Sequence, residues 1–541
     1  MLPKELIRRS ALKYKENTAF VCNKKRVSYY EFNLNVNKLG NALFKSGLSK
    51  GDHIGVLLPN CIEFIESRFA CYKSGMVFVP INIRMFNFDS IIKLLAHSKC
   101  SAAIIYESFR NEIELLRKSL PKIKIFIFVT EELGDYERYI DFIKKGSSEE
   151  PKVNLNEREI TAICYSSGTT GDPKGIISTH RNWMYSLHNL YTNSDTGITE
   201  KDTMLHLTPL THATSIFLLP FFMKGSKQVI MEQYNPKEII NTIKKEKVTA
   251  TFLVPPMMLG LLKETYKPWF LFNNYILRNN YFETLNTMIY GSAPISINHL
   301  KRCIKRFGMI LEQGYGMAEA FPPLANLKRG EHRTKNEEDQ RRLFSTGKVV
   351  KGVKIKIINN KGKEAKPLET GKIIIKSKTV TIGYLKQEAL TRRVYKRGWF
   401  YSNDMGFFDE EGYLYILGRI DDIIIKRGLN VHPKQIEDLL YSHPLVEECC
   451  VFGIPDLRFG EEIAAAIIKK GEVSEQEILD FCRENINPFL VPKLIEFHNT
   501  IPRNSNGKID RNSLKKKFWE GYNREEIIKT SVLPHTKVLK I

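Results

Sequence analysis

The chain has 541 residues, 43% of them hydrophobic, and a formal net charge of +22. A single hydrophobic core stops growing at about 250–300 residues, so this length predicts at least two domains. The nine cysteines show no C-x-x-C spacing, which argues against a zinc site or a disulfide scaffold and favours reduced thiols in a cytoplasmic protein. The longest apolar runs, such as residues 215–223, are much shorter than the ~20 residues of a membrane span, so we expect no integral membrane segment.

Three explanations fit the positive charge. It can reflect a lysine-rich composition, a basic cleft that attracts ATP and coenzyme A, or a surface that binds nucleic acid or anionic membranes. The basic residues are spread along the chain rather than gathered on one reading element. We therefore expect no nucleic-acid partner, and the charge alone does not separate the first two explanations.

Short apolar runs alternate with helical stretches from about Gly51 onwards. Near-continuous apolar strands between helices are typical of a parallel sheet covered on both faces, and we expect such a sheet here. The pattern resumes after Thr161, where Pro236 begins a helix and a strand follows at residues 250–254. The first strands are predicted at residues 54–58, 78–81, 102–106 and 125–129, and the first helices at residues 61–73 and 89–96.

The second half of the chain has a different pattern. Residues 144–156 and 328–342 are polar and charged, and we expect a surface connection and an exposed excursion there. After Ser345, strands at residues 353–358 and 371–375 indicate a smaller β-rich subdomain. A compact α+β unit is predicted beyond about Gly418, with strands at residues 449–452, 463–468 and 493–497 and a helix at residues 474–485.

A loop rich in glycine and hydroxyl side chains follows a strand predicted at residues 160–165, and a helix is expected from about Thr179. Glycines permit the positive φ angles that turn successive N–H groups towards one point, while hydroxyls and a lysine add donors and charge. The loop comprises Ser166, Ser167, Gly168, Thr169, Thr170, Gly171, Asp172, Pro173, Lys174 and Gly175. It lacks the Gly-Lys-Ser/Thr ending of a Walker loop. An ordinary turn explains the glycines but not the Pro-Lys-Gly ending, so we predict a cradle for a triphosphate.

This loop closely resembles the phosphate loop of the adenylate-forming superfamily, which comprises acyl-CoA synthetases, peptide-synthetase adenylation domains and beetle luciferases. The resemblance covers about residues 11–515 and is strongest to acyl-CoA synthetases. It implies an α/β fold, with a large N-terminal domain of stacked mixed sheets and helices and a small mobile α+β C-terminal domain. The implied boundaries are residues 1–418, with the β-rich subdomain at about 345–418, residues 419–520, and a basic tail at 521–541.

A histidine ends the sequence Pro-Leu-Thr-His at residues 209–212. A lone histidine after a strand is more often structural than functional, but this one looks like the family's Pro-x-x-His segment at the acyl pocket. The resemblance makes His212 a candidate catalytic residue. The aspartate that binds an α-amino group in peptide-synthetase domains has no clear counterpart here, so a plain carboxylic acid is the expected substrate.

Two glycine-containing motifs follow at the carboxyl ends of predicted strands, where open α/β sheets bind ligands. By resemblance the first motif, at residues 291–294, flanks adenine together with Tyr315. The resemblance also makes Glu319 catalytic and, with Thr169, a ligand of Mg²⁺, a hard cation that prefers oxygen. A buried loop of small residues is the alternative. The family's usual threonine is replaced by Ala318, which predicts slower adenylation, a shifted substrate or a compensating water. The nucleotide-binding candidates are Gly291, Ser292, Ala293, Pro294, Glu312, Gln313, Gly314, Tyr315 and Gly316.

Asp404 and Arg419 match two further nucleotide-binding positions of the family. The resemblance implies that Asp404 accepts both ribose hydroxyls and that Arg419 contacts the ribose or the α-phosphate. For Asp404 alone a surface turn would be the default interpretation, but the paired motifs at the family's spacing favour the nucleotide. Asn403 replaces the usual glycine, and Asp421 falls on the family's hinge.

Lys508 lies in a polar turn, where a lysine is normally just solvated. It matches the lysine that these enzymes move onto the carboxylate and the α-phosphate, where a cation offsets the crowding of negative charge. Around Gly428 the sequence is similar to the acyl-CoA synthetase pattern in which a glycine leaves room for the pantetheine arm of coenzyme A. Lys426 and Arg427 would then contact coenzyme A phosphates, although solvated surface charge explains both lysine and arginine equally well.

The resemblance implies an ATP-dependent acid–CoA ligase. Such an enzyme activates a fatty or aryl acid as an acyl-AMP, releases pyrophosphate and then forms the acyl-CoA thioester. Two alternatives stay open: transfer of the acyl group to a carrier-protein thiol or an amine, and a nucleotide-binding protein weakened in catalysis by Ala318. ATP, Mg²⁺ and coenzyme A are the expected cofactors and co-substrates. The sequence decides neither the acid nor whether the protein is a monomer or a homodimer.

Overall fold

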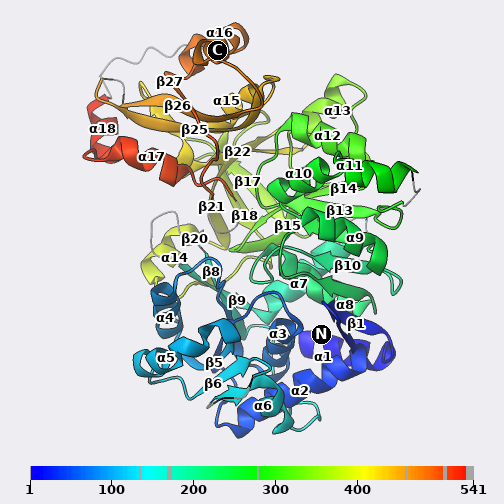
Figure 1. The fold of residues 1–541 in the computed structure, drawn as a ribbon. Coiled ribbons are helices and arrows are strands. Elements are labelled where there is room, and N and C mark those ends of the chain that lie inside the picture. The colour runs from blue at the N-terminus through cyan, green and yellow to red at the C-terminus, as the bar shows by residue number, and fades with distance from the viewer. Residues whose placement is uncertain are drawn as a thin grey trace.

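The computed structural model describes residues 2–132, 134, 136–166, 174–193, 195, 197–276, 280–458, 460–503 and 508–531. Within these residues the strands form four sheets, two of them large and stacked across helices. Figure 1 shows the small unit that contains α15 to α18 lying at one end of the larger body. The structure confirms an α/β fold with a large N-terminal and a smaller C-terminal part.

The first large sheet contains the strands predicted near the N-terminus. β3 pairs in parallel with β4 and β5, and β5 with β6, as the continuous apolar runs predicted. The sequence did not predict β9, which lies antiparallel to β8, so the phosphate loop joins two strands of a hairpin before the helix begins. The sheet order is β19 (Gly383–Tyr384), β9 (Lys174–Thr179), β8 (Ile160–Ser166), β4 (Val77–Pro80), β3 (His53–Leu57), β5 (Cys100–Tyr106), β6 (Ile125–Val129) and β7 (Glu137–Arg138).

The second large sheet is parallel in its centre and antiparallel at its ends. Its parallel strands bring the carboxyl ends of β12, β13 and β14 to one edge, where ligands of open α/β sheets bind. The order is β16 (Lys348–Val349), β15 (Ala320–Leu327), β14 (Leu311–Met317), β13 (Thr287–Gly291), β12 (Ala250–Leu253), β10 (Thr203–His206), β11 (Lys227–Ile230), β1 (Thr18–Cys22) and β2 (Lys25–Ser28).

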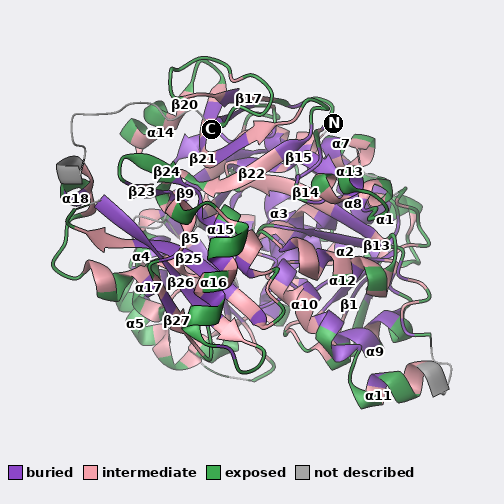
Figure 2. Ribbon diagram, turned by 90° about the horizontal axis from the view of Figure 1, so that it is seen from above, coloured by how far each residue is buried: buried purple, intermediate pink, exposed green. Residues whose placement is uncertain are grey.

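Helices cover both large sheets, and one continuous core lies between the sheets. That core joins Phe78 of the first sheet, Phe20 of the second and Phe222 of α8, all nearly or fully buried. The predicted helix at Pro236 is confirmed: Asn235 caps it, and Ile239 is buried beneath it. Figure 2 shows that most strands are buried while many helices keep an exposed face. The helices of this part are α1 (Pro3–Lys13), α2 (Tyr29–Lys45), α3 (Ile62–Ser74), α4 (Phe88–His97), α5 (Ile113–Ser119), α6 (Tyr139–Lys144), α7 (His180–Asn193), α8 (Leu218–Met223), α9 (Pro236–Glu246), α10 (Pro255–Glu264), α11 (Pro268–Leu271), α12 (Ile297–Phe307) and α13 (Glu337–Arg342).

Both polar stretches make contacts with buried polar groups. The first was predicted as a surface connection, yet its Glu150 forms an ion pair of 2.7 Å with the fully buried Lys73. The second was predicted as an exposed excursion, and this prediction is wrong in part. It forms a short 3-10 turn and α13, and it buries the imidazole of His332, which lies 3.0 Å from the hydroxyl of Tyr290. Polar composition concealed these contacts because the buried groups are hydrogen-bonded rather than apolar.

A third sheet forms the predicted β-rich region after Ser345. Its long strand β21 pairs on one edge with β18 and on the other with β22, and the chain leaves β22 through the 3-10 turn Ile420–Asp422. The elements here are β17 (Lys354–Ile358), β18 (Gly371–Lys376), α14 (Glu388–Val394), β20 (Tyr395–Lys396), β21 (Trp399–Phe408) and β22 (Leu414–Arg419).

The C-terminal unit is built on the antiparallel pair β25 and β26, with β27 parallel to β26. It has its own core, which includes Ile436, Val451 and Ile463. Part of the lysine-rich end is helical: α18 packs on this sheet, and Arg524 forms an ion pair of 2.8 Å with Glu461. The elements are β23 (Ile424–Lys426), β24 (Leu429–Val431), α15 (Pro433–Leu440), β25 (Val446–Asp456), β26 (Gly460–Lys469), α16 (Glu475–Asn485), β27 (Leu494–Phe497), α17 (Arg511–Trp519) and α18 (Arg524–Ser531).

The sequence predicted no integral membrane segment. Over the part of the chain that the structure covers, no helix combines the length and the apolar character needed to cross a bilayer.

Candidate functional site

The phosphate loop closes the β8–β9 hairpin. Ser166, the last residue of β8, pairs across the hairpin with Lys174, the first of β9. Tyr165 anchors this end, since its hydroxyl lies 2.8 Å from Nδ1 of His97. The structure thus fixes where the loop begins and ends. Five predicted phosphate-binding residues lie outside the described residues: Ser167, Gly168, Thr169, Thr170 and Gly171.

The two predicted adenine segments lie side by side. Gly291 at the end of β13 pairs in register with Gly314 of β14. A Cβ atom at Gly291 would lie 2.4 Å from the carbonyl oxygen of Gly314, so no larger residue fits this contact. Ser292, Ala293 and Pro294 follow β13, and Ser292 has a positive φ of 66°. The second motif, predicted to follow a strand, instead forms β14 itself from Glu312 to Gly316.

Strained and buried groups support these segments. Positive φ in a residue other than glycine is uncommon and costly, and it clusters at functional sites. Behind the segments, Glu312 is buried and accepts a hydrogen bond of 2.5 Å from Asn326, and Gln313 accepts one of 3.3 Å from Tyr290. Both side chains are therefore held by protein partners, and they fix β14 from behind.

Asp404 lies where three motifs meet. The hydroxyl of Tyr315 donates to Oδ2 of Asp404 at 2.7 Å. Asp404 also pairs across β21 and β22 with Arg419, whose Nε is 3.8 Å from Oδ1. Burial, and then the negative charge of Asp404, raise the pKa of Tyr315, so its hydroxyl stays a donor at neutral pH. The carboxylate keeps further lone pairs for hydroxyl donors of a ligand.

Glu319 lies in the turn between β14 and β15 and is oriented by neighbours that the sequence did not reveal. Tyr384 donates to its Oε1 at 2.9 Å, and its backbone carbonyl accepts from the amide of Thr381 at 2.8 Å. Burial and the Glu319 charge raise the pKa of Tyr384, which keeps this hydroxyl protonated as a donor. Ala318 directly precedes Glu319 and is exposed in the same turn.

The donor set at Glu319 suits Mg²⁺. A carboxylate has several lone pairs, so the bond from Tyr384 leaves capacity for a hard cation. The second predicted ligand, Thr169, lies outside the described residues. Over the described residues, no cluster of three or more His, Cys, Asp or Glu side chains forms an all-protein metal site. Such a site is not expected for Mg²⁺, which is usually held by one or two carboxylates together with phosphates of the substrate.

Lys508 comes from the C-terminal unit and lies near Asp404 and Arg419. Much of the residue is exposed, yet desolvation by surrounding protein lowers the pKa of its ammonium. The positive charge of Arg419 lowers this pKa further, and the negative charge of Asp404 opposes both effects. Electrostatic effects of this kind act over short distances in water. The structure therefore brings together three predicted residues that are far apart in the sequence.

His212 lies beside a network that the sequence did not predict. Its Nε2 is 3.1 Å from Nδ2 of Asn82, so this ring nitrogen accepts the amide hydrogen. Nearby, the fully buried His206 contacts Gln228 at 2.9 Å and Thr214 at 3.0 Å. Burial lowers the pKa of His206 to about 4, so its ring is neutral at physiological pH. These partners belong to different elements, and no local sequence pattern marks them.

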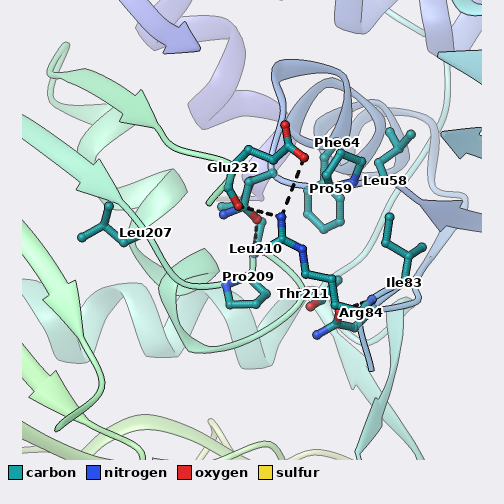
Figure 3. Close-up of a pocket in the computed structure, with 12 residues that line it drawn as sticks. Leu58, Pro59, Phe64, Ile83, Arg84, Leu207, Pro209, Leu210, Thr211 and Glu232 are labelled. Atoms are coloured by element: carbon teal, nitrogen blue, oxygen red, sulfur yellow. Dashed lines mark hydrogen bonds and ion pairs between the residues drawn. The ribbon is translucent and has the colours of Figure 1, made fainter. Parts of the chain in front are cut away.

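A pocket lies next to the Pro209–His212 segment (Figure 3). Its volume is about 350 Å³, which includes the solvent space at its open mouth. Arg84 stands at this pocket and donates to the backbone carbonyl of Glu232 at 3.0 Å, with the Glu232 carboxylate 3.7 Å away. Helix α3 and the segments that follow β3, β4, β10 and β11 supply the lining: Leu58, Pro59, Asn60, Phe64, Asn82, Ile83, Arg84, Leu207, Pro209, Leu210, Thr211 and Glu232.

The candidate coenzyme A motif separates into two kinds of residue. Lys426 is buried and forms an ion pair of 2.8 Å with Glu462, so in this arrangement its ammonium binds protein rather than a coenzyme A phosphate. Arg427 and Gly428 are exposed in the turn between β23 and β24, both with positive φ. Lys426 and Arg427, which the sequence pattern did not distinguish, thus differ in this arrangement: Lys426 is buried against Glu462, and Arg427 is exposed.

The C-terminal unit contacts the larger body through α12 and the end of α15. Asn298 donates to the backbone carbonyl of Tyr441 at 3.0 Å, and the rings of His299 and Tyr441 pack edge to face, 5.5 Å apart. Lys263 of α10 also forms an ion pair with Glu447. These contacts define one orientation of the two parts, the one in which Lys508 lies near Asp404.

Two family models match the chain. The model described as "AMP-binding enzyme" matches residues 7–385, and "AMP-binding enzyme C-terminal domain" matches residues 435–508. The first covers well over half of the chain. The two matches together include the predicted nucleotide-binding segments up to β19 and extend to Lys508.

Similar proteins share this range. A feruloyl-CoA synthase from Amycolatopsis sp. is 28% identical over 91% of this chain and 94% of its own length. A 2-succinylbenzoate–CoA ligase from Bacillus licheniformis is 30% identical over 88% of this chain and 92% of its own. Among solved structures, the o-succinylbenzoate coenzyme A synthetase of Bacillus subtilis in complex with AMP has a TM-score of 0.79 and 26% identity, covering 94% of this chain and 98% of that one.

Proposed function

Because the chain belongs to the AMP-binding enzyme family, we propose that Asp404, Arg419 and Lys508 form the adenylation site of an AMP-forming acid–CoA ligase. The chain is an acid–CoA ligase of this family, as its curated relatives are. The observation that supports the site is that Nε of Arg419 lies 3.8 Å from Asp404, and that the charges of both residues act on Lys508 of the C-terminal unit.

In the first step the carboxylate of the acid attacks the α-phosphate of ATP. A bond forms between a carboxylate oxygen and the α-phosphorus, and the bond to the β-phosphate oxygen breaks, which releases pyrophosphate. Asp404 accepts the ribose hydroxyls, and Tyr315 keeps that carboxylate in place. Lys508 and Arg419 place positive charge where two anions meet, which lowers the electrostatic cost of the attack.

The phosphate loop and Glu319 serve the leaving group. We propose that the hydroxyls and amides of Ser166, Ser167, Thr169 and Thr170, with Lys174, hold the β- and γ-phosphates as pyrophosphate departs. Mg²⁺ bound by Glu319 would neutralise phosphate charge. Tyr384 orients the Glu319 carboxylate towards the site.

The second step forms the thioester. The thiol of coenzyme A loses its proton to solvent and its sulfur attacks the acyl carbon; the bond between that carbon and the phosphate oxygen breaks, and AMP leaves with the electron pair. We propose that the C-terminal unit first rotates at Asp421, which withdraws Lys508 and brings the turn at Arg427 and Gly428 to the cleft. Such a rotation lets one cleft serve two reactions in sequence.

The acid is proposed to be an aryl or fatty acid that binds beside His212. The names of two relatives, for ferulate and 2-succinylbenzoate, support an aromatic body, and the missing aspartate for an α-amino group argues against amino acids. We propose that His212, oriented by Asn82, contributes to the wall of the acid site.

A pyrophosphate-release screen tests the function. Purified full-length protein is incubated with ATP, Mg²⁺ and one acid at a time: ferulate, 2-succinylbenzoate, benzoate, octanoate, palmitate or phenylalanine, with and without coenzyme A. We expect acid-dependent pyrophosphate with at least one aryl or fatty acid, and a thioester only when coenzyme A is present. Absence of pyrophosphate with every acid would overturn the adenylation site. Acyl-AMP that accumulates without a thioester would instead indicate a carrier-protein or amine acceptor.

A further inference from the structure

The side chain of Asn403 contacts the hinge. Asn403 directly precedes Asp404 in β21. The adenylate-forming enzymes that this chain resembles usually have glycine at this position. The Nδ2 of Asn403 donates to Oδ2 of Asp421 at 2.6 Å. Asp421 lies in the 3-10 turn that connects β22 to the C-terminal unit. A glycine has no side chain to make this bond, so the contact is a product of this particular sequence.

The other side of the hinge is fastened to the C-terminal unit. Arg524 of α18 donates to the backbone carbonyl of Asp421 at 3.2 Å and to that of Ile423 at 2.5 Å. The same guanidinium forms an ion pair with the buried carboxylate of Glu461 in β26. Arg524 therefore joins the hinge turn to the C-terminal sheet, whereas Asn403 joins the same turn to β21 of the larger body.

These two contacts respond differently to a rotation at Asp421. Ile423, Glu461 and Arg524 lie beyond the pivot or bind elements beyond it, so they move together and keep their bonds. Asn403 stays with β21, and its amide can follow the Asp421 carboxylate only over the length of one side chain. The Asn403–Asp421 bond is therefore available in the orientation in which the charge of Asp404 acts on Lys508, and it breaks when the C-terminal unit turns away.

We propose that Asn403 is a positioning residue that latches the hinge in the adenylation orientation and thereby slows the passage to thioester formation. This inference rests on the two-step function proposed above. Asn403 acts through Asp421 and does not touch the reacting atoms. An exposed hydrogen bond to a carboxylate competes with water and has a modest net strength, so its loss should shift the balance of orientations by about 3- to 10-fold.

Hydrogen–deuterium exchange measures the latch directly. The full-length protein with AMP as the probe is compared with Asn403→Ala and with Asn485→Ala, whose asparagine on α16 bonds only within its own helix in the described contacts. We expect exchange in residues 420–426 to rise by about 3- to 10-fold in Asn403→Ala and to stay unchanged in Asn485→Ala. Unchanged exchange in Asn403→Ala would overturn the proposal.

The ratio of the two half-reaction rates distinguishes a latch from a merely structural role, because loss of structural support would lower both rates together. We use the acid that releases most pyrophosphate in the screen, and its purified acyl-AMP. In Asn403→Ala the rate of thioester formation relative to adenylation should rise by about 3- to 10-fold, with the KM for ATP unchanged. Equal loss of both rates, or a raised KM for ATP, would mean that Asn403 only supports Asp404, and would overturn the latch.

The two hypotheses fail in different ways. The proposed function fails if the unsubstituted protein releases no pyrophosphate with any acid. The latch fails if Asn403→Ala and the unsubstituted protein show the same hinge exchange, a comparison that needs no acid and no turnover. A protein that adenylates but has an unchanged hinge therefore keeps its function and loses only the latch.

Discussion

At the scale of single residues, tyrosine hydroxyls set the geometry of the site. Tyr315 donates to Asp404 and Tyr384 donates to Glu319, so each carboxylate is oriented before a nucleotide binds. Because burial raises both tyrosine pKa values, neither hydroxyl ionises near neutral pH. Pre-orientation of this kind lowers the reorganisation that the reaction would otherwise require.

Restoring a hydroxyl at position 318 should accelerate adenylation. Ala318 is exposed in the turn before Glu319, so Ala318→Thr has room there and should not alter folding. The new hydroxyl would add a hydrogen bond near the α-phosphate, and we expect the adenylation rate to rise by about 3- to 10-fold. Acid-dependent ATP–pyrophosphate exchange measures the effect.

Ala318→Val is the matched control, since valine has the branched shape of threonine without its hydroxyl. We expect Ala318→Val to leave exchange unchanged or lower it. An equal gain in both variants would attribute the effect to shape rather than to a hydrogen bond, and a threonine without any gain would mean that the site already compensates for the missing hydroxyl.

The sequence predicted the residues of contiguous motifs but not their partners. Asp404, Arg419 and Lys508 were predicted by resemblance, and the structure brings them together. Tyr384 and Asn82 were missed because each reaches its partner from a distant element, and a single sequence contains no signal for such a pairing. For the same reason Lys426 could not be separated from Arg427, although it lies buried against Glu462.

At the scale of elements, the strands with continuous apolar sequence were predicted well, and β9 was not. Its sequence mixes two isoleucines with lysine, glycine, serine and threonine, so neither a period of two nor an apolar run marks it. The strand forms because it pairs with β8 on one side and with β19 on the other. Such pairing is a long-range contact, which local propensity does not encode.

The interface between α12 and α15 should depend on pH through His299. Burial, together with the positive charges of Lys470 and Arg302, lowers the pKa of His299 to about 4 from 6.5. An undocked histidine with a pKa near 6.5 binds a proton more readily than the docked one. The docked orientation is therefore fully favoured above about pH 6.5 and weakens as the pH falls towards about 4.

Hydrogen exchange of α15 between about pH 5 and about pH 7 measures this dependence, after correction for intrinsic exchange. We expect protection to fall at the lower pH in the unsubstituted protein. His299→Phe retains an aromatic ring against Tyr441 and removes the titrating group, so its protection should change much less. The same pH dependence in both proteins would exclude His299 as the cause.

At the scale of the whole molecule, the proposed adenylation site requires the two parts of the chain to be docked, because Lys508 comes from the C-terminal unit. Lys508→Ala tests this directly. Removing a positive charge from the position of developing anionic charge should lower adenylation by about 10²- to 10³-fold. Thioester formation from supplied acyl-AMP should continue at its normal rate, because Lys508 has by then moved away.

Pyrophosphate release and thioester formation are measured separately in this test. Lys516→Ala is the matched control, since Lys516 is an exposed lysine on the neighbouring helix α17. It should leave both steps unchanged. If Lys508→Ala slowed both half-reactions equally, the lysine would act in a single fixed orientation, and the rotation at Asp421 would be contradicted.

The N-terminal and C-terminal parts of the chain have separate hydrophobic cores, which affects how the substrate preference of such enzymes can evolve. The C-terminal unit packs around Ile436, Val451 and Ile463, whereas Leu210, beside His212, packs into the core between the two large sheets. A substitution that reshapes the proposed acid site beside His212 would therefore leave undisturbed the packing that carries Lys508. Selection can alter the choice of acid while the chemistry of activation is inherited unchanged, so a family can acquire new substrates by drift in one part of the chain alone.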